Sequence, residues 1–148
     1  MDIELPKDFK EFLKLLNEKN VKYLLIGGYA VGYYGYPRAT NDIDIWVEVS
    51  SDNADKIVEV VRKFGFTQHE LNKELFLKTD QIIRMGLPPL RIEISTGISG
   101  VDFAESYSEK EIADFGDLQV DTISLKHLKI NKKAAARFKD LADLENLP

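Results

Sequence analysis

The stretch 38-RATNDIDIWVE-48 places two aspartates, Asp42 and Asp44, inside a run of residues that favour β-strands. Apolar residues alternate with the aspartates, which predicts a strand with one buried face and one face that carries both carboxylates. Residues two positions apart on a strand lie about 6.5–7 Å apart at Cα, so the two charges repel each other. A divalent cation between them removes this repulsion, and the pair therefore indicates a metal site. The alternative is an ordinary acidic pair on a solvent-facing strand.

Helical and alternating patterns outside this stretch predict a chain of mixed secondary structure. Helices are expected at 7–20, 29–36, 52–65, 125–138 and 139–147, and strands at 21–26, 42–49, 81–87, 90–96 and 118–124. Ser50 or Ser51 is expected to cap the helix at 52–65, and Ser124 the helix at 125–138. This order of elements predicts an α/β (α+β) fold in a single domain of residues 1–148, with a mixed β-sheet flanked by helices and a C-terminal helical segment.

Three segments leave the secondary structure more open. Pro88 and Pro89 separate two predicted strands, which favours a hairpin with a stiff turn. Segment 71–79 fits either a helix or a strand, and segment 101–111 fits a short helix or a loop.

Composition excludes several kinds of chemistry. The 148 residues are 44% hydrophobic and 30% charged, as in an ordinary globular protein, and include no cysteine. Disulfides, thiolate catalysis and cysteine-ligated zinc are therefore excluded. His69 and His127 have no second histidine at ligand spacing, so we expect each to be a surface or packing residue.

The charge distribution is uneven. The net charge of −5 gives the whole chain no nucleic-acid-binding signature, but residues 126–139 hold six Lys or Arg and no acidic residue. Such a run is typical of a solvated helix face, and it would also suit a polyphosphate or an RNA backbone. The N-terminus lacks a signal-peptide pattern and no apolar run is long enough to span a membrane, so we expect a cytoplasmic protein with no membrane partner.

Gly27 and Gly28 end the predicted strand 21–26 and open the following helix. A strand that ends in glycines before a helix presents free backbone N–H groups, and glycine lets phosphate oxygens approach closely. The run is neither a dinucleotide-binding fingerprint nor a Walker loop. It indicates a phosphate-binding turn, with an ordinary turn as the alternative.

A third carboxylate is expected to join the aspartate pair. Glu93 lies on the polar face of strand 90–96, and a neighbouring strand in register would bring it beside Asp42 and Asp44. Asp102 is the rival candidate, and an exposed Glu93 paired with Arg84 is the non-catalytic alternative. Hard oxygen ligands without His or Cys favour Mg²⁺ or Mn²⁺ over zinc.

In combination, these motifs resemble the nucleotidyltransferase superfamily with the DNA polymerase β-like fold. An apolar strand, Gly-Gly, a short helix and Arg-x-Thr-x-Asp-Ile-Asp follow one another, and Gly28 and Asp42 are 14 positions apart. The sequence is most similar to minimal members related to the abortive-infection (AbiEii-type) toxin group. The closing stretch 124-SLKHLKINKKAAARFKDLADLENL-147 is similar to that group's final pattern.

The resemblance implies two sets of functional residues. The first binds the metal ions and supports catalysis: Asp42, Asp44 and Glu93. The second contacts the nucleotide: Gly27, Gly28, Arg38, Thr40, Lys132, Arg137 and Asp140. Two positions depart from the family pattern, which often has glycine where Ala136 stands and proline where Phe138 stands. The third acid is commonly aspartate in the family, whereas Glu93 has a longer reach.

The function implied is Mg²⁺- or Mn²⁺-dependent transfer of a nucleoside monophosphate from an NTP to an acceptor hydroxyl, with release of pyrophosphate. Candidate acceptors are an RNA, notably a tRNA end, a protein side chain, or a small hydroxylated compound such as an antibiotic. The short chain leaves room for a partner protein of the toxin–antitoxin type or for a homodimer. The competing hypotheses are a catalytically inactive nucleotide-binding or antitoxin-like interaction domain, and a globular domain whose acidic pair has no function.

Overall fold

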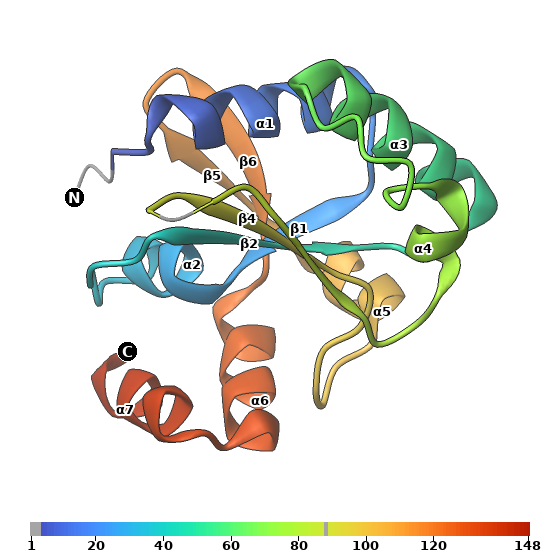
Figure 1. Ribbon diagram of the computed structural model, residues 1–148. Coiled ribbons are helices and arrows are strands. Elements are labelled where there is room, and N and C mark those ends of the chain that lie inside the picture. The colour runs from blue at the N-terminus through green and yellow to red at the C-terminus, as the bar shows by residue number, and fades with distance from the viewer. Residues whose placement is uncertain (1–3, 88) are drawn as a thin grey trace.

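A computed structural model describes residues 4–87 and 89–148, which form a six-stranded mixed sheet with helices on both faces (Figure 1). The helices are α1 (Lys7–Glu18), α2 (Gly27–Tyr33), α3 (Ser51–Phe64), α4 (Lys73–Leu77), α5 (Phe103–Ser108), α6 (Leu125–Ala135) and α7 (Phe138–Asn146). The strands are β1 (Tyr23–Ile26), β2 (Asp42–Val47), β3 (Ile82–Met85), β4 (Arg91–Ser95), β5 (Glu111–Phe115) and β6 (Leu118–Thr122). The predicted α/β class with a mixed sheet is confirmed.

The sheet has the order β3-β4-β2-β1-β6-β5. Strand β2 pairs antiparallel with β1 and parallel with β4, and β1 pairs parallel with β6. The predicted hairpin of β3 and β4 is confirmed by their antiparallel pairing, although Pro88 of its turn lies outside the described residues. The strand that carries the aspartates therefore has a neighbour on each side.

Alternation along β2 separates two apolar clusters. Ile43 and Ile45 face the larger cluster, which packs against α1 and α3. Trp46 faces the other side of the sheet, where it packs edge-on against Phe103 of α5. Asp44 shares the face of Trp46 because residues two positions apart on a strand lie on one side. The acidic face of β2 therefore looks toward the side of the sheet that holds α5, α6 and α7 (Figure 1).

Strand β5 was absent from the sequence prediction, which ended a helix or loop at residue 111. Ile112 and Asp114 are exposed while Ala113 and Phe115 are buried, an alternation that fits an edge strand. The turn Gly116-Asp117 joins β5 to β6 in register, and Gly116 has φ +71°. Glycine–aspartate between two alternating runs is a hairpin signal that could have located this strand.

The ambiguous segments are also settled. Segment 71–79 contains helix α4, capped by the side chain of Asn72, and segment 101–111 contains helix α5. Ser50 caps α3 and Ser124 caps α6, as expected. No helix in the described ranges is long and apolar enough to cross a membrane.

The predicted C-terminal helix 125–138 ends earlier than expected. Ala136 adopts a left-handed conformation with φ +53° and stops α6, and Phe138 is the first residue of α7. Glycine is favoured after the end of a helix in this conformation, and proline is favoured at the first helical position. These are the residues that the family often carries at the two positions. Ala136 and Phe138 suit these two positions less well than glycine and proline would.

Candidate active site

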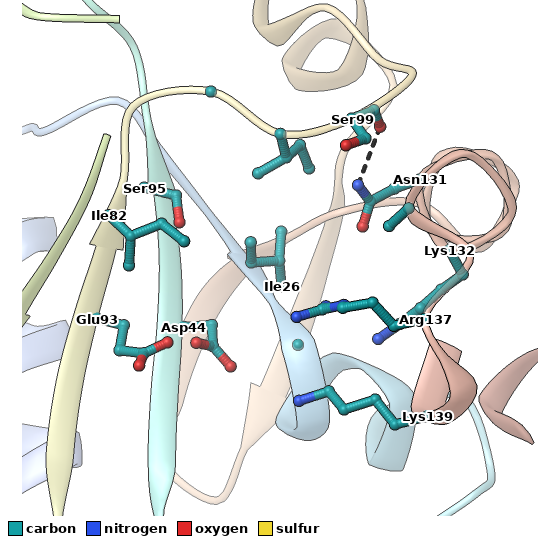
Figure 2. Close-up of a pocket in the computed structure, with 14 residues that line it drawn as sticks. Ile26, Asp44, Ile82, Glu93, Ser95, Ser99, Asn131, Lys132, Arg137 and Lys139 are labelled. Atoms are coloured by element: carbon teal, nitrogen blue, oxygen red, sulfur yellow. Dashed lines mark hydrogen bonds between the residues drawn. The ribbon is translucent and has the colours of Figure 1, made fainter. Parts of the chain in front are cut away.

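The register of β2 and β4 brings two carboxylates together. Asp44 lies opposite Glu93 in this parallel pair, and Figure 2 shows their carboxylates pointing toward each other. The predicted adjacency of the two acids is thereby confirmed. Asp102 instead caps α5, accepting a hydrogen bond from the backbone N–H of Glu105 at 3.1 Å, and does not line the same cavity.

The environment makes Asp44 hard to ionise. Burial, and after it the neighbouring Glu93 carboxylate, together raise the pKa of its carboxyl group to about 7. Lys139 opposes this effect by favouring the charged form. A cation that bound between Asp44 and Glu93 would remove both the repulsion and much of the cost of burial.

Asp42 is neutralised in a different way. Arg91 lies opposite it in the register, and its guanidinium donates to both carboxylate oxygens of Asp42, at 3.1 and 3.3 Å. A bidentate guanidinium is the geometry that best satisfies a carboxylate. Asp42 and Asp44 therefore coexist on one strand face because Asp42 is paired with Arg91 and Asp44 holds its proton up to about neutral pH. Arg91 was not among the predicted site residues, although it alternates with Glu93 on the same strand.

Glu93 uses one oxygen outside the acidic pair. Arg84 of β3 donates to Glu93 Oε1 at 2.8 Å, as the non-catalytic alternative expected. Arg84 is more than half exposed, so solvent screens this ion pair. Glu93 thus takes part in both arrangements that the sequence analysis considered, and its other oxygen is not engaged by Arg84.

Gly27 makes room for Asp44. A Cβ atom at Gly27 would lie 2.1 Å from Asp44 Oδ2, and the residue has φ +70°, which side chains disfavour. Gly28 has a separate role, because a Cβ there would lie 3.1 Å from the side chain of Thr40. Thr40 in turn hydrogen bonds to the backbone of Asp42 at the start of β2. The double glycine therefore shapes the acidic site from both sides.

A cavity of about 360 Å³ lies in front of the acidic pair. Asp44 and Glu93 form part of one wall, and Arg137 and Lys139 extend toward them from the C-terminal segment (Figure 2). Within the part of the chain that the structure describes, Lys139 has no ion-pair partner. The cavity is lined by Ile26, Gly27, Asp44, Ile82, Glu93, Ser95, Gly97, Ile98, Ser99, Asn131, Lys132, Ala135, Arg137 and Lys139.

A buried ionic network engages four of the predicted nucleotide-binding residues, which are Arg38, Lys132, Arg137 and Asp140. The Lys132 side chain is 4% exposed, and its ammonium lies 3.2 Å from Asp140 Oδ1 and 3.1 Å from Asp143 Oδ2. Arg38 donates to both carboxylate oxygens of Asp143, at 3.0 and 3.1 Å. Lys132 and Arg38 therefore have a structural role, because their ion pairs link α6 and the segment before β2 to α7.

Arg137 joins the network from the solvent side. It donates to both oxygens of Asp140, and these hydrogen bonds, with those of Lys132, hold the pKa of Asp140 below its usual value despite burial. The side chain of Arg137 is 65% exposed and also lines the cavity. Of the predicted cations, Lys132 and Arg137 both line the cavity, but Arg137 is far more exposed and is therefore better placed to meet a ligand. Lys139 is an additional cation that the sequence analysis did not select.

The donor set near the cavity fits a hard divalent cation. Asp44 and Glu93 offer carboxylate oxygens to the cavity. Asp42 lies two residues before Asp44 on the same face of β2 and is not among the residues that line the cavity. Oxygen-only ligands suit Mg²⁺ or Mn²⁺. The close approach that Gly27 permits and the raised pKa of Asp44 are what a site for a cation would show in its absence.

We predict that Gly27→Ala is more damaging than Gly35→Ala. Both glycines have positive φ, but a Cβ at Gly35 would meet nothing within 4 Å. Each substitution should cost about 1 kcal/mol through its backbone conformation, and Gly27→Ala about 2 kcal/mol more because Asp44 must move. Urea denaturation measures both values, and equal losses would contradict the assigned role of Gly27.

We predict that Asp44→Asn stabilises the metal-free protein in a pH-dependent way. The pKa of Asp44 is raised on folding, so the folded state binds the proton more tightly than the unfolded chain does. Wild-type stability from this group is present below about pH 4 and is lost as the pH rises toward 7. The advantage of Asp44→Asn should grow from near zero at pH 4 to on the order of 4 kcal/mol at pH 8.

Urea denaturation in EDTA across this pH range tests the effect. Asp114→Asn, on the exposed side of β5, is the matched control and should show no such trend. A difference between Asp44→Asn and wild type that stays constant with pH would refute the raised pKa.

Comparisons with known proteins give a likeness of fold. No family model and no curated protein matches the sequence. Among solved structures, the chain is similar to TM1012 from Thermotoga maritima, which is provisionally assigned as a nucleotidyltransferase, with 15% identity, a TM-score of 0.63, and coverage of 97% of this chain and 92% of that one. It is also similar to the lincosamide antibiotic adenylyltransferase LnuA, solved with lincomycin bound, with 15% identity, a TM-score of 0.58, and coverage of 97% and 96%. Neither structure bears on the abortive-infection group. The six-stranded mixed sheet and its flanking helices are the nucleotidyltransferase fold.

Proposed function

We propose that this protein is a metal-dependent nucleotidyltransferase that moves a nucleoside monophosphate from an NTP to an acceptor hydroxyl and releases pyrophosphate. The observation that carries the proposal is the cavity whose one wall holds Asp44 and Glu93 and whose other wall holds Arg137 and Lys139. A site with carboxylates on one side and cations on the other suits a metal-bound polyphosphate. Its volume of about 360 Å³ is in the range of small-ligand sites.

Asp42, Asp44 and Glu93 would hold Mg²⁺ or Mn²⁺ in this scheme. When bound, the cation supplies charge stabilisation for the entering and leaving oxygens of an in-line displacement. Arg91 holds the Asp42 carboxylate at the edge of the site through two hydrogen bonds. Gly27 leaves the space in which the Asp44 carboxylate sits beside Glu93.

The remaining residues position phosphates and move a proton. Lys139 and Arg137 neutralise the triphosphate, and Lys139 is the more available because Arg137 also binds Asp140. The acceptor oxygen attacks the α-phosphorus, the bond from this atom to the bridging oxygen breaks, and pyrophosphate leaves. Glu93 accepts the hydroxyl proton through the oxygen that Arg84 does not bind.

We further propose a small hydroxylated molecule as acceptor in preference to RNA. The basic run at 126–139 does not form a continuous cationic surface, because Lys132 is buried and Lys126 lies 3.6 Å from Glu109. Ile82 and Ile98 add apolar surface to the cavity wall, which suits a compact acceptor. LnuA, which has a similar extent, is named for transfer to a lincosamide antibiotic.

We predict that Asp44→Asn abolishes nucleotidyl transfer while Asp114→Asn does not. Each labelled NTP would be incubated with Mg²⁺ or Mn²⁺ and with separate pools of metabolites, RNA and protein, and both label transfer and pyrophosphate release would be measured. Loss of at least 100-fold in rate is expected for Asp44→Asn, since a metal ligand is removed. Label in the metabolite pool supports the proposal in full.

Other outcomes of this assay separate the competing hypotheses. Label on tRNA ends would favour the toxin-type role and overturn the small-molecule acceptor. NTP binding without pyrophosphate release from any pool would indicate an inactive nucleotide-binding or antitoxin-like domain. Absence of both binding and release would leave the acidic pair without a function.

We predict opposite behaviour for two lysines of the C-terminal segment. Lys139→Gln should weaken binding of Mg²⁺–NTP by about tenfold, with an unchanged Tm, because it removes from the cavity a cation that has no ion-pair partner among the described residues. Lys132→Met should lower the free energy of unfolding by about 3 kcal/mol because it leaves Asp140 and Asp143 without their shared cation. Calorimetric titration and thermal denaturation measure the two effects. An unchanged Tm with lost nucleotide binding for Lys132→Met would restore the role that the resemblance implied for Lys132.

A further inference from the structure

A second cluster of potential metal ligands lies away from the cavity, between α5 and α6. His127 occupies the first turn of α6 and is 2% exposed. Its Nε2 atom is buried and has no hydrogen-bond partner among the residues that the structure describes. A buried polar atom without a partner costs stability, so its direction calls for an explanation.

Nε2 of His127 faces two carboxylates. Oε1 of Glu105 lies 3.7 Å away and Oε2 of Glu109 lies 3.6 Å away. The three ligand atoms all lie within 4.8 Å of one another. Glu105 and Glu109 are four residues apart, at α5 and its C-terminal end, so they project from the same side. One buried nitrogen and two oxygens therefore converge on a single point.

The separations suit a common cation better than direct hydrogen bonds. Both N···O distances exceed hydrogen-bond length. Two ligands that each lie about 2.0–2.1 Å from a tetrahedral zinc ion are about 3.3–3.4 Å apart. Glu105 and Glu109 are 65% and 46% exposed at their side chains, so each can move the few tenths of an ångström that remain.

The other nitrogen of the ring is already oriented. Nδ1 of His127 lies 2.9 Å from Ser124 Oγ, the residue that caps α6. In the tautomer with the proton on Nδ1, this nitrogen donates a hydrogen bond to Ser124 Oγ, and the lone pair of Nε2 points at the two carboxylates. A hydrogen bond to the second ring nitrogen is the usual way in which proteins orient a metal-ligating histidine.

We propose that His127, Glu105 and Glu109 form a binding site for Zn²⁺, separate from the active-site cavity. An imidazole nitrogen with two carboxylates favours a borderline metal such as zinc over Mg²⁺. Three protein ligands leave the fourth position to water. The proposal does not depend on the proposed function, because none of the three residues lines the cavity.

Two features of the surroundings compete with this assignment. Lys126 lies 3.6 Å from Glu109 Oε1 and partly neutralises that carboxylate. The two glutamates also lie near the N-terminus of α6, whose dipole favours negative charge. These features explain why the carboxylates are tolerated, but they leave the direction of Nε2 unexplained.

Bound zinc would affect the wall of the cavity through α6. Asn131, one turn after His127, donates to the backbone oxygen of Ser99 at 2.9 Å, and Asn131 and Ser99 both line the cavity. A cation that joins α5 to the first turn of α6 would restrain the loop between β4 and α5 at two points. One is the start of α5, and the other is Ser99, which is bound by Asn131 of α6. The zinc site would therefore be linked to the cavity wall through α6, although none of its three ligands lines the cavity.

Zinc titration of a protein with one histidine tests the proposal. His69 is 91% exposed at its side chain, so His69→Gln leaves His127 as the sole imidazole without affecting the fold. Asp44→Asn is added to remove cation binding in the cavity. Isothermal titration of the EDTA-treated protein with Zn²⁺ gives the stoichiometry, and ¹⁵N NMR of the ring identifies the nitrogen that binds. One zinc per chain, a shift confined to Nε2, and a rise in Tm on the order of 5 °C are expected.

Two further variants complete the test. Glu105→Gln with Glu109→Gln retains the imidazole and changes only exposed side chains, and it should weaken zinc binding at least tenfold. His127→Gln should remove the binding. Mg²⁺ in place of Zn²⁺ should give neither the Nε2 shift nor the rise in Tm. Unchanged ring resonances on addition of zinc, or equal zinc affinity in the double glutamine variant, would overturn the proposal.

Discussion

The parallel pairing of β2 with β4 holds Asp44 against Glu93, and the candidate site depends on this one constraint. Electrostatic repulsion between the two carboxylates disfavours this arrangement. They are held together because Ile43, Ile45 and the apolar residues of β4 are buried on the opposite face, where their burial stabilises the sheet by several kcal/mol. A shift of the register by one residue would move every one of these side chains to the wrong face. Hydrophobic burial thus supports an arrangement that electrostatics opposes.

The protein relieves the resulting repulsion in ways that leave the cavity open. Arg91 neutralises Asp42 beside the cavity, and Asp44 retains its proton up to about neutral pH. Gly27 leaves the space that the Asp44 carboxyl occupies beside the backbone, at the wall of the cavity. Neither device uses the cations of the C-terminal segment, and Lys139 therefore stays available for a ligand.

The ionic network beneath α7 explains how those cations reach the site. Arg38, Lys132, Asp140 and Asp143 link three segments that are far apart in sequence. A buried network of this kind contributes little net stability compared with apolar packing, but its geometry is demanding. It fixes the angle at which α7 leaves the break at Ala136, and so it directs Arg137 and Lys139 toward the carboxylates. Arg38 and Lys132 are engaged by carboxylates of α7, and a sequence motif cannot distinguish such a structural role from contact with a ligand.

Patterns of apolar residues and the acidic motif of β2 determined most of the elements and the mixed sheet, because side-chain alternation is a local property. They also predicted Glu93 beside Asp42 and Asp44, and the register places it opposite Asp44, with Arg91 opposite Asp42. The edge strand β5 was not predicted because its exposed Ile112 is apolar, which obscures the alternation of polar and apolar residues. Only the tertiary structure decided which basic residues face the cavity, since Lys132 and Lys139 look alike in sequence and differ in whether Asp140 and Asp143 lie within reach. The same holds for His127, whose carboxylate neighbours come from another helix. The role of each charged residue depends on partners that are distant in sequence and close in the fold. Local sequence patterns do not reveal these partners.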